Sequence, residues 1–308
     1  MKKATVAIVG CGRVGSSIAY GLALRQLCDE ILLCDVDQVR AAGEVYDIQD
    51  VCMTSDEDLS VRAAGYADCA GADILVIAAG AARKPGQTIQ ENVSQSVKTC
   101  RKILDGVLEN GFQGIVLFVG IKANTVLQDI LHYSRLPANR VIGPGNMLET
   151  NRLRVAVSDG LGVPASEIKD LYVLGEDCAT FSAAMVGKTP LLDRLSREQA
   201  QELLNHSAKK GSIINNSKPV PTYYGISSAV IDLIEAILYN ECRTVSVSAI
   251  LQGAYGLEDV FIGVPAVVGK HGIERVCEIP LDAGELDRLA AAQEAVKSDN
   301  FAYLQVLP

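Results

Sequence analysis

The chain has 308 residues, a net charge of −9, 49% apolar residues and 21% charged residues. This length is sufficient for two domains that share a large core. The negative charge disfavours nucleic acid and anionic membrane surfaces as partners, so a small anionic ligand would need local Arg or Lys side chains. We find neither a run of about 18 uninterrupted apolar residues nor the pattern of a secretory signal, and we therefore expect a cytoplasmic protein without membrane contact.

The first half of the chain alternates short apolar runs with longer helical patterns. Apolar runs without alternation are typical of strands that are buried on both faces of a parallel sheet. Strand–helix–strand repetition of this kind predicts an α/β fold with a doubly wound, parallel Rossmann sheet. We predict strands over 4–9, 30–34, 74–79, 114–119 and 140–143, and helices over 14–27, 39–51 and 90–109.

The pattern changes after residue 145, where longer helices and alternating strands predominate. This change predicts a dinucleotide-binding domain over 1–143, followed by an α+β substrate domain over 144–308. We predict helices over 147–160, 196–210, 227–239 and 281–297, a strand over 168–175, and antiparallel strands over 244–251 and 260–268.

The nine cysteines are scattered, and no two of them form a C-x-x-C pair. An odd number without paired spacing predicts neither a disulfide framework nor a zinc site. We expect buried, reduced thiols and no bound metal.

A glycine motif follows the first predicted strand and opens the first helix. Gly10, Gly12 and Gly15 have the G-x-G-x-x-G spacing, and Asp35 ends the next strand 20 residues after the last glycine. Such glycines allow a tight turn, close approach of a pyrophosphate and close packing of helix on strand. The carboxylate would accept hydrogen bonds from the adenosine ribose and repel a 2′-phosphate. The motif therefore predicts NAD as cofactor.

Six stretches, the first of which contains the glycine motif, extend the pattern over both halves of the chain. They are Gly-Cys-Gly-Arg-Val-Gly-Ser-Ser-Ile-Ala-Tyr at 10–20, Ala-Ala-Gly-Glu-Val-Tyr-Asp-Ile at 41–48, the loop at 79–86, Arg-Val-Ile-Gly at 140–143, Thr-Tyr-Tyr-Gly-Ile at 222–226 and Pro-Ala-Val-Val-Gly at 265–269. With these stretches the chain resembles the lactate/malate dehydrogenase family, which interconverts 2-oxo and 2-hydroxy acids with NAD. The resemblance implies a homodimer or homotetramer and cofactor contacts from Gly10, Gly12, Arg13, Val14, Gly15, Asp35, Ala79, Gly80, Ala81 and Val119.

The same resemblance assigns the residues that bind substrate. Arg152 matches the family's carboxylate-binding arginine, whose planar fork suits two-point contact. Arg83 matches an arginine that binds the second carboxylate of oxaloacetate in malate dehydrogenases, which favours a dicarboxylic substrate. Thr222 lies in the matched Thr-Tyr-Tyr-Gly-Ile stretch, and Glu149 takes the place of the aspartate that holds the catalytic histidine.

Several catalytic positions of the family hold other residues. The histidine position is Asp177, the position of the mobile-loop arginine is Ile89, and that of the orienting asparagine is Ile121. Lys122 stands where the family has the proline that follows the asparagine. The segment after Thr180 is several residues shorter than in the family.

Three interpretations of these substitutions remain open. One is a structural or binding protein that has lost even NAD, and the intact cofactor motif argues against it. If Asp177 and Glu149 come close together, they cannot both ionise at low energetic cost, and one carboxyl group can stay protonated and act as the acid. The protein is then an oxidoreductase for a 2-oxo or 2-hydroxy acid with altered catalytic groups. If Asp177 is instead a tolerated polar residue, the protein is an inactive NAD-binding pseudoenzyme with a role in regulation or in a mixed oligomer.

Overall fold

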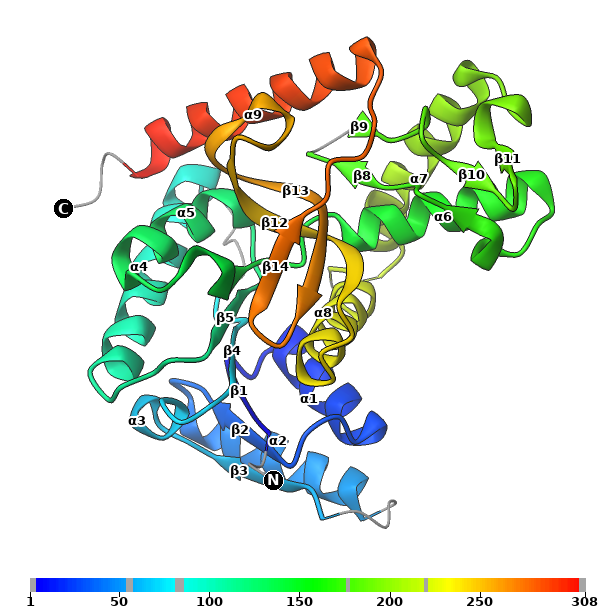
Figure 1. The fold of residues 1–308 in the computed structure, drawn as a ribbon. Coiled ribbons are helices and arrows are strands. Elements are labelled where there is room, and N and C mark those ends of the chain that lie inside the picture. Colours follow the sequence, from blue (N-terminus) through cyan, green and yellow to red (C-terminus); the bar gives the residue numbers. More distant parts are fainter. Residues whose placement is uncertain (1–3, 54–57, 81–85, 176–177, 219–220, 305–308) are drawn as a thin grey trace.

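The computed structural model describes residues 4–53, 58–80, 86–175, 178–218 and 221–304. The first half forms a six-stranded sheet in the order β3-β2-β1-β4-β5-β6 (Figure 1), and every pair of neighbouring strands is parallel. The strands are β1 (Thr5–Val9), β2 (Glu30–Cys34), β3 (Ser60–Ala63), β4 (Ile74–Ile77), β5 (Ile115–Phe118) and β6 (Val141–Ile142). The strand order reverses between β1 and β4, which is where doubly wound sheets bind ligands.

Helices cover both faces of this sheet. The helices are α1 (Arg13–Arg25), α2 (Gln38–Cys52), α3 (Tyr66–Cys69), α4 (Ile89–Leu108) and α5 (Ala123–Ser134). Strand side chains such as Ile8 and Val76 pack with α1 and α2 on one face, and their neighbours Val9 and Ile77 pack with α4 and α5 on the other. All four residues of β4 are buried, as the unbroken apolar run predicts.

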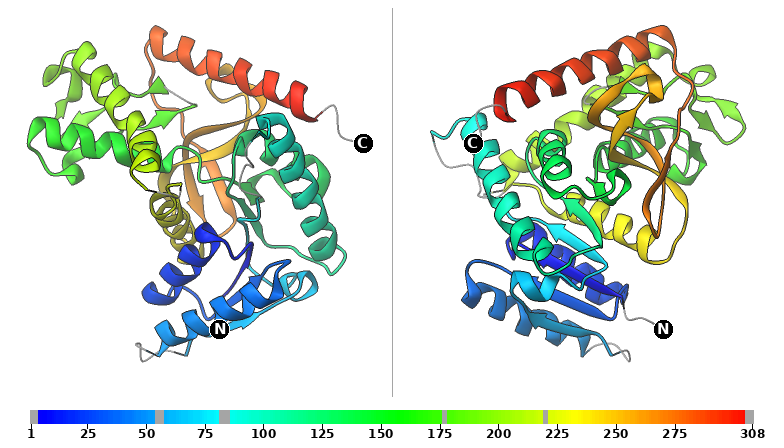
Figure 2. Two further views of the ribbon diagram at one scale, coloured as in Figure 1. Left: turned by 180° about the vertical axis from the view of Figure 1, so that it is seen from behind. Right: turned by 60° about the vertical axis from the view of Figure 1, so that its left-hand side comes forward.

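The second half is an α+β unit around an antiparallel sheet. Its sheet contains β12 (Arg243–Gln252), β13 (Glu258–Gly269) and β14 (Gly272–Val276). The helices α6 (Met147–Leu161), α8 (Tyr224–Leu238) and α9 (Ala283–Leu304) pack against this sheet, and α7 (Arg197–Ser217) packs against α6. A lobe formed with α7 extends away from the sheet (Figure 2) and contains the short strands β7 (Ile168–Lys169), β10 (Met185–Val186) and β11 (Thr189–Pro190). A further short pair is β8 (Val173–Leu174) with β9 (Cys178–Ala179).

The two halves share their hydrophobic cores, so the second half packs directly against the six-stranded sheet and its helices. Residues of α8 and β12 pack in the same cluster as α1, and Phe261 of β13 packs with α4 and α5. The C-terminal helix α9 lies across α5 and the adjacent part of α4 (Figure 1). Within the described ranges, no helix is both long and apolar enough to span a membrane.

The predicted fold class is confirmed, but some element predictions were wrong or incomplete. The single strand predicted over 168–175 is two strands, because Asp170 has φ +53° and interrupts the extended backbone. Strand β3 was not predicted because only Val61 of its four residues is buried. Helix α5 and strand β14 were also not predicted.

Candidate functional site

The turn between β1 and α1 contains three glycines, each in a different steric environment. Gly10 has φ +103°, and a Cβ there would lie 2.6 Å from the backbone nitrogen of Ala79. A Cβ on Gly15 would lie 1.9 Å from the carbonyl oxygen of Gly10, so α1 packs directly against the turn. A Cβ on Gly12 would meet no atom within 4 Å. The turn therefore leaves open space in front of the N-terminus of α1, where backbone N–H groups bind anions.

Asp35 follows β2 and connects that strand to the glycine turn. Its Oδ2 accepts a hydrogen bond from the backbone N–H of Cys11 at 2.8 Å, and its Oδ1 accepts one from Asp37 at 2.9 Å. The carboxylate is therefore fixed beside the turn, where the sequence predicts a ribose-binding group. Burial, with a smaller contribution from the charge of Asp35, raises the pKa of the Cys11 thiol to about 12. The thiol thus stays neutral and adds no negative charge to the turn.

A cavity of about 570 Å³ opens beside this turn. We call it the cofactor cavity, because its wall contains five of the residues predicted to bind NAD, namely Gly10, Gly12, Asp35, Ala79 and Gly80. The open space at Gly12 and the fixed carboxylate suit a pyrophosphate and a ribose, so the residues present fit a dinucleotide.

Cationic side chains on the other wall of the cofactor cavity were not predicted. Arg40 of α2 and Lys98 and Lys102 of α4 line it, together with Gln95 and Thr99. The i, i+4 spacing of the two lysines on the exposed side of α4 was the sequence signal for a shared face. These cations provide local positive charge for an anionic cofactor in a chain whose net charge is −9.

Three other predicted cofactor residues, two of them at the start of α1 and one after β5, do not line this cavity. Arg13 is exposed and lines a shallow surface cavity with Tyr223, so its side chain lies on the outer side of α1. Val14 packs against the core, where its carbonyl accepts a hydrogen bond from Ser227 Oγ at 3.3 Å. Val119 lines the neighbouring cavity after β5. The predicted contact of Ala81 lies outside the described residues.

Two adjoining cavities of about 170 and 450 Å³ continue along the same edge of the sheet. We call them together the substrate crevice. They share Ala123, Asn124, Gly145, Asn146 and Gly175. The segments after β5, β6 and β8 therefore meet here, next to the switch in strand order.

The two predicted residues on α6 are neighbours, and of the two only Glu149 lines this crevice. Glu149 lines the crevice from the first turn of the helix, and its Oε1 lies 4.0 Å from Arg152 Nη1. Arg152 is largely buried, with 14% of its side chain exposed, and its guanidinium lies beside Gly211 of α7. The two groups are thus neighbours, as the sequence predicts.

The other predicted substrate residues are placed as follows. Thr222 lies in the connection before α8, where its backbone N–H donates to Asn215 Oδ1 at 2.8 Å. Ile226 of α8, one turn further on, lines the crevice. Asp177 and Arg83 lie outside the described residues.

Polar residues that were not predicted line the crevice beside Glu149. Lys122 Nζ contacts Asp299 Oδ2 of α9 at 2.8 Å. Ser248 Oγ of β12 donates to Asn124 Oδ1 at 2.7 Å. Ile121 is 50% exposed at the mouth of the crevice. These contacts join segments that are far apart in the sequence, so no local pattern could indicate them.

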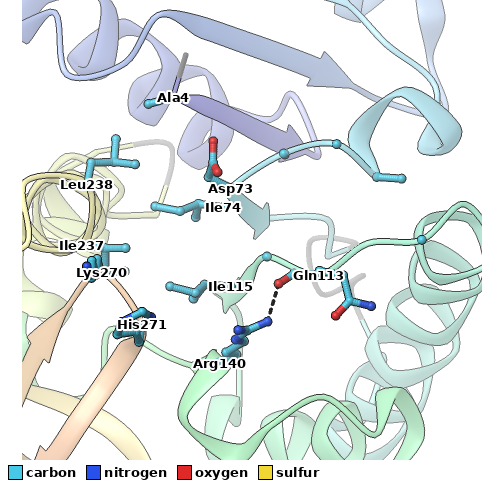
Figure 3. Close-up of a pocket in the computed structure, with 15 residues that line it drawn as sticks. Ala4, Asp73, Ile74, Gln113, Ile115, Arg140, Ile237, Leu238, Lys270 and His271 are labelled. Atoms are coloured by element: carbon cyan, nitrogen blue, oxygen red, sulfur yellow. Dashed lines mark hydrogen bonds between the residues drawn. The ribbon is translucent and has the colours of Figure 1, made fainter. Parts of the chain in front are cut away.

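A further cavity, of about 440 Å³, lies at the opposite edge of the sheet (Figure 3), where β1, β4 and β5 begin. Arg140 lines it and already donates to the carbonyl oxygen of Gln113 at 2.6 Å. Ligands of doubly wound sheets bind at the carboxyl ends of the strands, so this cavity is not the candidate site.

Models of one family match both halves of the chain. The NAD-binding domain of lactate/malate dehydrogenase matches residues 4–143, and the family's α/β C-terminal domain matches residues 147–301. The chain belongs to the lactate/malate dehydrogenase family. It is an NAD-binding oxidoreductase of this family by descent, and the predicted family and cofactor are confirmed.

Relatives in this family are similar over the full chain. An L-lactate dehydrogenase 3 of Bacillus cereus is 35% identical, over 96% of this chain and 98% of the relative. An L-lactate dehydrogenase 2 of Enterococcus faecalis is 37% identical over 91% of each. The ligand-bound structure of the minor L-lactate dehydrogenase of Enterococcus mundtii superposes with a TM-score of 0.93 at 30% identity, and covers 99% of both chains.

Proposed function

We propose that the protein reduces a short 2-oxo acid to the 2-hydroxy acid with NADH, using a carboxyl group in place of the family's catalytic histidine. The supporting observation is the arrangement of two neighbouring cavities at one sheet edge. The lining of the cofactor cavity suits NAD, and the adjoining crevice is lined by Glu149, whose Oε1 lies 4.0 Å from Arg152 Nη1. When bound, the nicotinamide supplies a hydride, and the protein must supply the proton and the carboxylate contact.

The roles follow from the chemistry of the side chains. Arg152 would bind the substrate carboxylate through its planar fork. Arg83 would bind a second carboxylate, and Thr222 would contact substrate from the start of α8. Glu149 and Asp177 would share the proton that the substrate oxygen receives. Gly175, two residues before Asp177, lines the crevice together with Glu149, which supports this pairing.

A second candidate is a pseudoenzyme that binds NAD without turning over substrate. Ile89 and Ile121 stand at the predicted positions of the loop arginine and the asparagine, and they are 42% and 50% exposed. Neither side chain polarises a carbonyl group. Losing a general acid lowers the rate by about 10²–10⁴, and losing a preorganised donor lowers it by about 10²–10³. Turnover is therefore expected to be slow.

NADH oxidation at high enzyme concentration separates the two candidates. Pyruvate, oxaloacetate and larger 2-oxo acids are tested from pH 5 to pH 8. We expect turnover that rises towards low pH, because the acid must be protonated, and loss of turnover in Asp177→Asn. Unchanged turnover in Asp177→Asn would refute a carboxyl acid at this position. No turnover in protein that binds NADH would favour the pseudoenzyme.

We further propose that the protein is a homo-oligomer. Large apolar side chains are exposed on helices α1, α2 and α8, among them Tyr20 (49%), Leu24 (57%), Tyr46 (70%) and Tyr224 (62%). Exposed apolar groups of this size mark interaction surfaces. Light scattering after gel filtration should give a dimer or tetramer, and Leu24→Glu should shift it to monomer. A wild-type monomer would contradict this assembly.

The intracellular location is supported by the thiols. Most of the nine cysteines are buried, and none of them forms a disulfide. Cysteines outside disulfides are typical of a reducing compartment, so we propose that the protein functions in the cytoplasm. Fractionation of cells that produce the protein tests this, and recovery from the extracytoplasmic fraction would contradict it.

A further inference from the structure

Lys122 has a backbone conformation that few side chains adopt. It precedes α5 with φ +50° and ψ +45°, in the left-handed region. Residues with a Cβ are strained there, and strained residues of this kind cluster at functional sites. The proline that the family has at this position is fixed near φ −65° and excludes this backbone. The replacement of proline by lysine therefore allows a left-handed backbone conformation at this position beside the crevice.

The side chain of Lys122 is held in place by the C-terminal helix. Its Nζ lies 2.8 Å from Asp299 Oδ2, and the two side chains are 32% and 20% exposed. Both residues line the substrate crevice, together with Glu149 and Gly175. Helix α9, which contains Asp299, packs against α5. The ammonium group is thus fixed at a partly buried position between two packed helices, next to the group proposed to share the proton.

Among the described residues that line the crevice, Lys122 alone has a cationic side chain. The predicted position of the loop arginine holds Ile89, and that of the orienting asparagine holds Ile121. An ammonium group is a point charge with three N–H donors, so the contact with Asp299 is compatible with donation to a ligand oxygen. A partly buried charge acts more strongly on such an oxygen than a solvated one. Because the protein has a net charge of −9, an anionic ligand also needs a local cation.

We propose that Lys122, positioned by Asp299, is the cationic residue that binds the carbonyl oxygen of the 2-oxo acid whose carboxylate is bound by Arg152. This inference rests on the proposed function and deepens it. In the family, an arginine on a loop makes this contact with the carbonyl oxygen. In this chain, Lys122 would make it from a position between α5 and α9. Asp299 acts through Lys122 and is a positioning residue.

Binding of oxamate, an unreactive 2-oxo acid analogue, tests this role without turnover. Calorimetric titration of oxamate into NADH-saturated protein compares the wild type with Lys122→Met, Lys122→Arg and Lys297→Met. We expect Lys122→Met to weaken oxamate binding about 10- to 100-fold, as the loss of a charged hydrogen bond does. Lys122→Arg should restore part of this binding, and Asp299→Asn should weaken it less than Lys122→Met. NADH affinity should stay within about twofold, because Lys122 does not line the cofactor cavity.

Lys297→Met is the matched control, because it removes the same charge from an exposed position on α9. It should leave both affinities unchanged. Oxamate binding by Lys122→Met at wild-type affinity, in wild-type protein that does bind oxamate, would overturn the role of Lys122 and leave the proposed function intact. In that case the contact with Asp299 only joins two helices, and Lys122→Met would change the melting temperature alone. Wild-type protein that binds NADH but not oxamate would overturn the proposed function, and with it this inference.

Discussion

The cofactor cavity and the substrate crevice lie along one edge of the same sheet, but they relate to the family pattern in opposite ways. At the cofactor cavity, the steric environment of the turn requires glycine at Gly10 and Gly15, and Gly12 faces open space. At the crevice, Ile121 lines the wall at the position predicted for the family's asparagine, and Lys122 contacts Asp299. Under the proposed function, NAD binding and the chemistry on substrate are therefore separable properties of this chain.

The difference has a physical cause. The glycine turn binds through backbone N–H groups and through the absence of side chains, so only glycine fits at Gly10 and Gly15. The crevice acts through side-chain charges, and a charge can be supplied from another position as long as it reaches the same atom. The backbone geometry of the turn therefore determines which residue type can stand there, whereas the crevice requires only a group of suitable charge.

The largest effects are expected in the glycine turn. Gly10→Ala should destabilise the protein by about 2–6 kcal/mol, because backbone strain adds to a clash with Ala79. Gly12→Ala should leave the free energy of unfolding within about 0.5 kcal/mol. It should nevertheless weaken NADH binding about 10- to 100-fold, since the methyl group fills the space for the pyrophosphate. Chemical denaturation and NADH titration of both variants test this, and equal NADH affinity in Gly12→Ala and wild type would contradict the assigned site.

A buried carboxylate tests how much a polar network contributes to the free energy of unfolding in the second half of the chain. Glu285 of α9 is fully buried, accepts the backbone N–H of Ser182 at 3.0 Å and pairs with Arg197 at 3.3 Å. Glu285→Ala should cost about 2–4 kcal/mol, because buried donors and a cation lose their partner. Asp282→Ala, which removes a more exposed partner of the same arginine, should cost only about 1 kcal/mol. Similar denaturation midpoints for the two variants would show that the buried network contributes little.

A matched pair of aspartates isolates the ribose contact. Asp35→Ala should weaken NADH binding about 10- to 100-fold, because charged hydrogen bonds are lost. Asp37→Ala removes the cap of α2, where Asp37 Oδ1 accepts the N–H of Arg40 at 3.1 Å. It should lower stability by about 1 kcal/mol without changing NADH affinity. If titration shows equal affinity for Asp35→Ala and wild type, the predicted ribose contact is wrong.

The smallest expected effect concerns the start of α4, which follows the loop at 79–86 in the sequence. The backbone N–H of Thr88 donates to Glu91 and lowers the pKa of that carboxyl group. Because its pKa is lowered, the carboxylate stabilises the folded state at pH values above its ordinary pKa of about 4.3. This stabilisation is lost as the pH falls through the lower pKa of the folded state. Glu91→Gln should therefore lower the melting temperature at pH 7, and the difference from wild type should shrink in acid. A constant difference across pH would contradict the capping role.

The sequence predicted the parts of this molecule that depend on local pattern. Unbroken apolar runs predicted β1, β2, β4 and β5, and glycine spacing with Asp35 predicted the cofactor cavity. Contacts between distant segments were beyond such patterns. Nothing near Lys122 indicates that α9 would bring Asp299 to it, and nothing near Asp35 indicates its hydrogen bond to Cys11. The lysine pair of α4 had the right spacing, but helix spacing alone does not show which cavity a helix lines.

The central claim is that the chain retains NAD binding while the group that moves the proton has changed. NADH titration followed by addition of 2-oxo acid to the same sample, for wild type and Asp177→Asn, tests it most directly. We predict that both proteins bind NADH with the same affinity and that only the wild type oxidises the bound NADH in a single turnover. Loss of NADH binding in Asp177→Asn, or equal oxidation by both proteins, would contradict the claim.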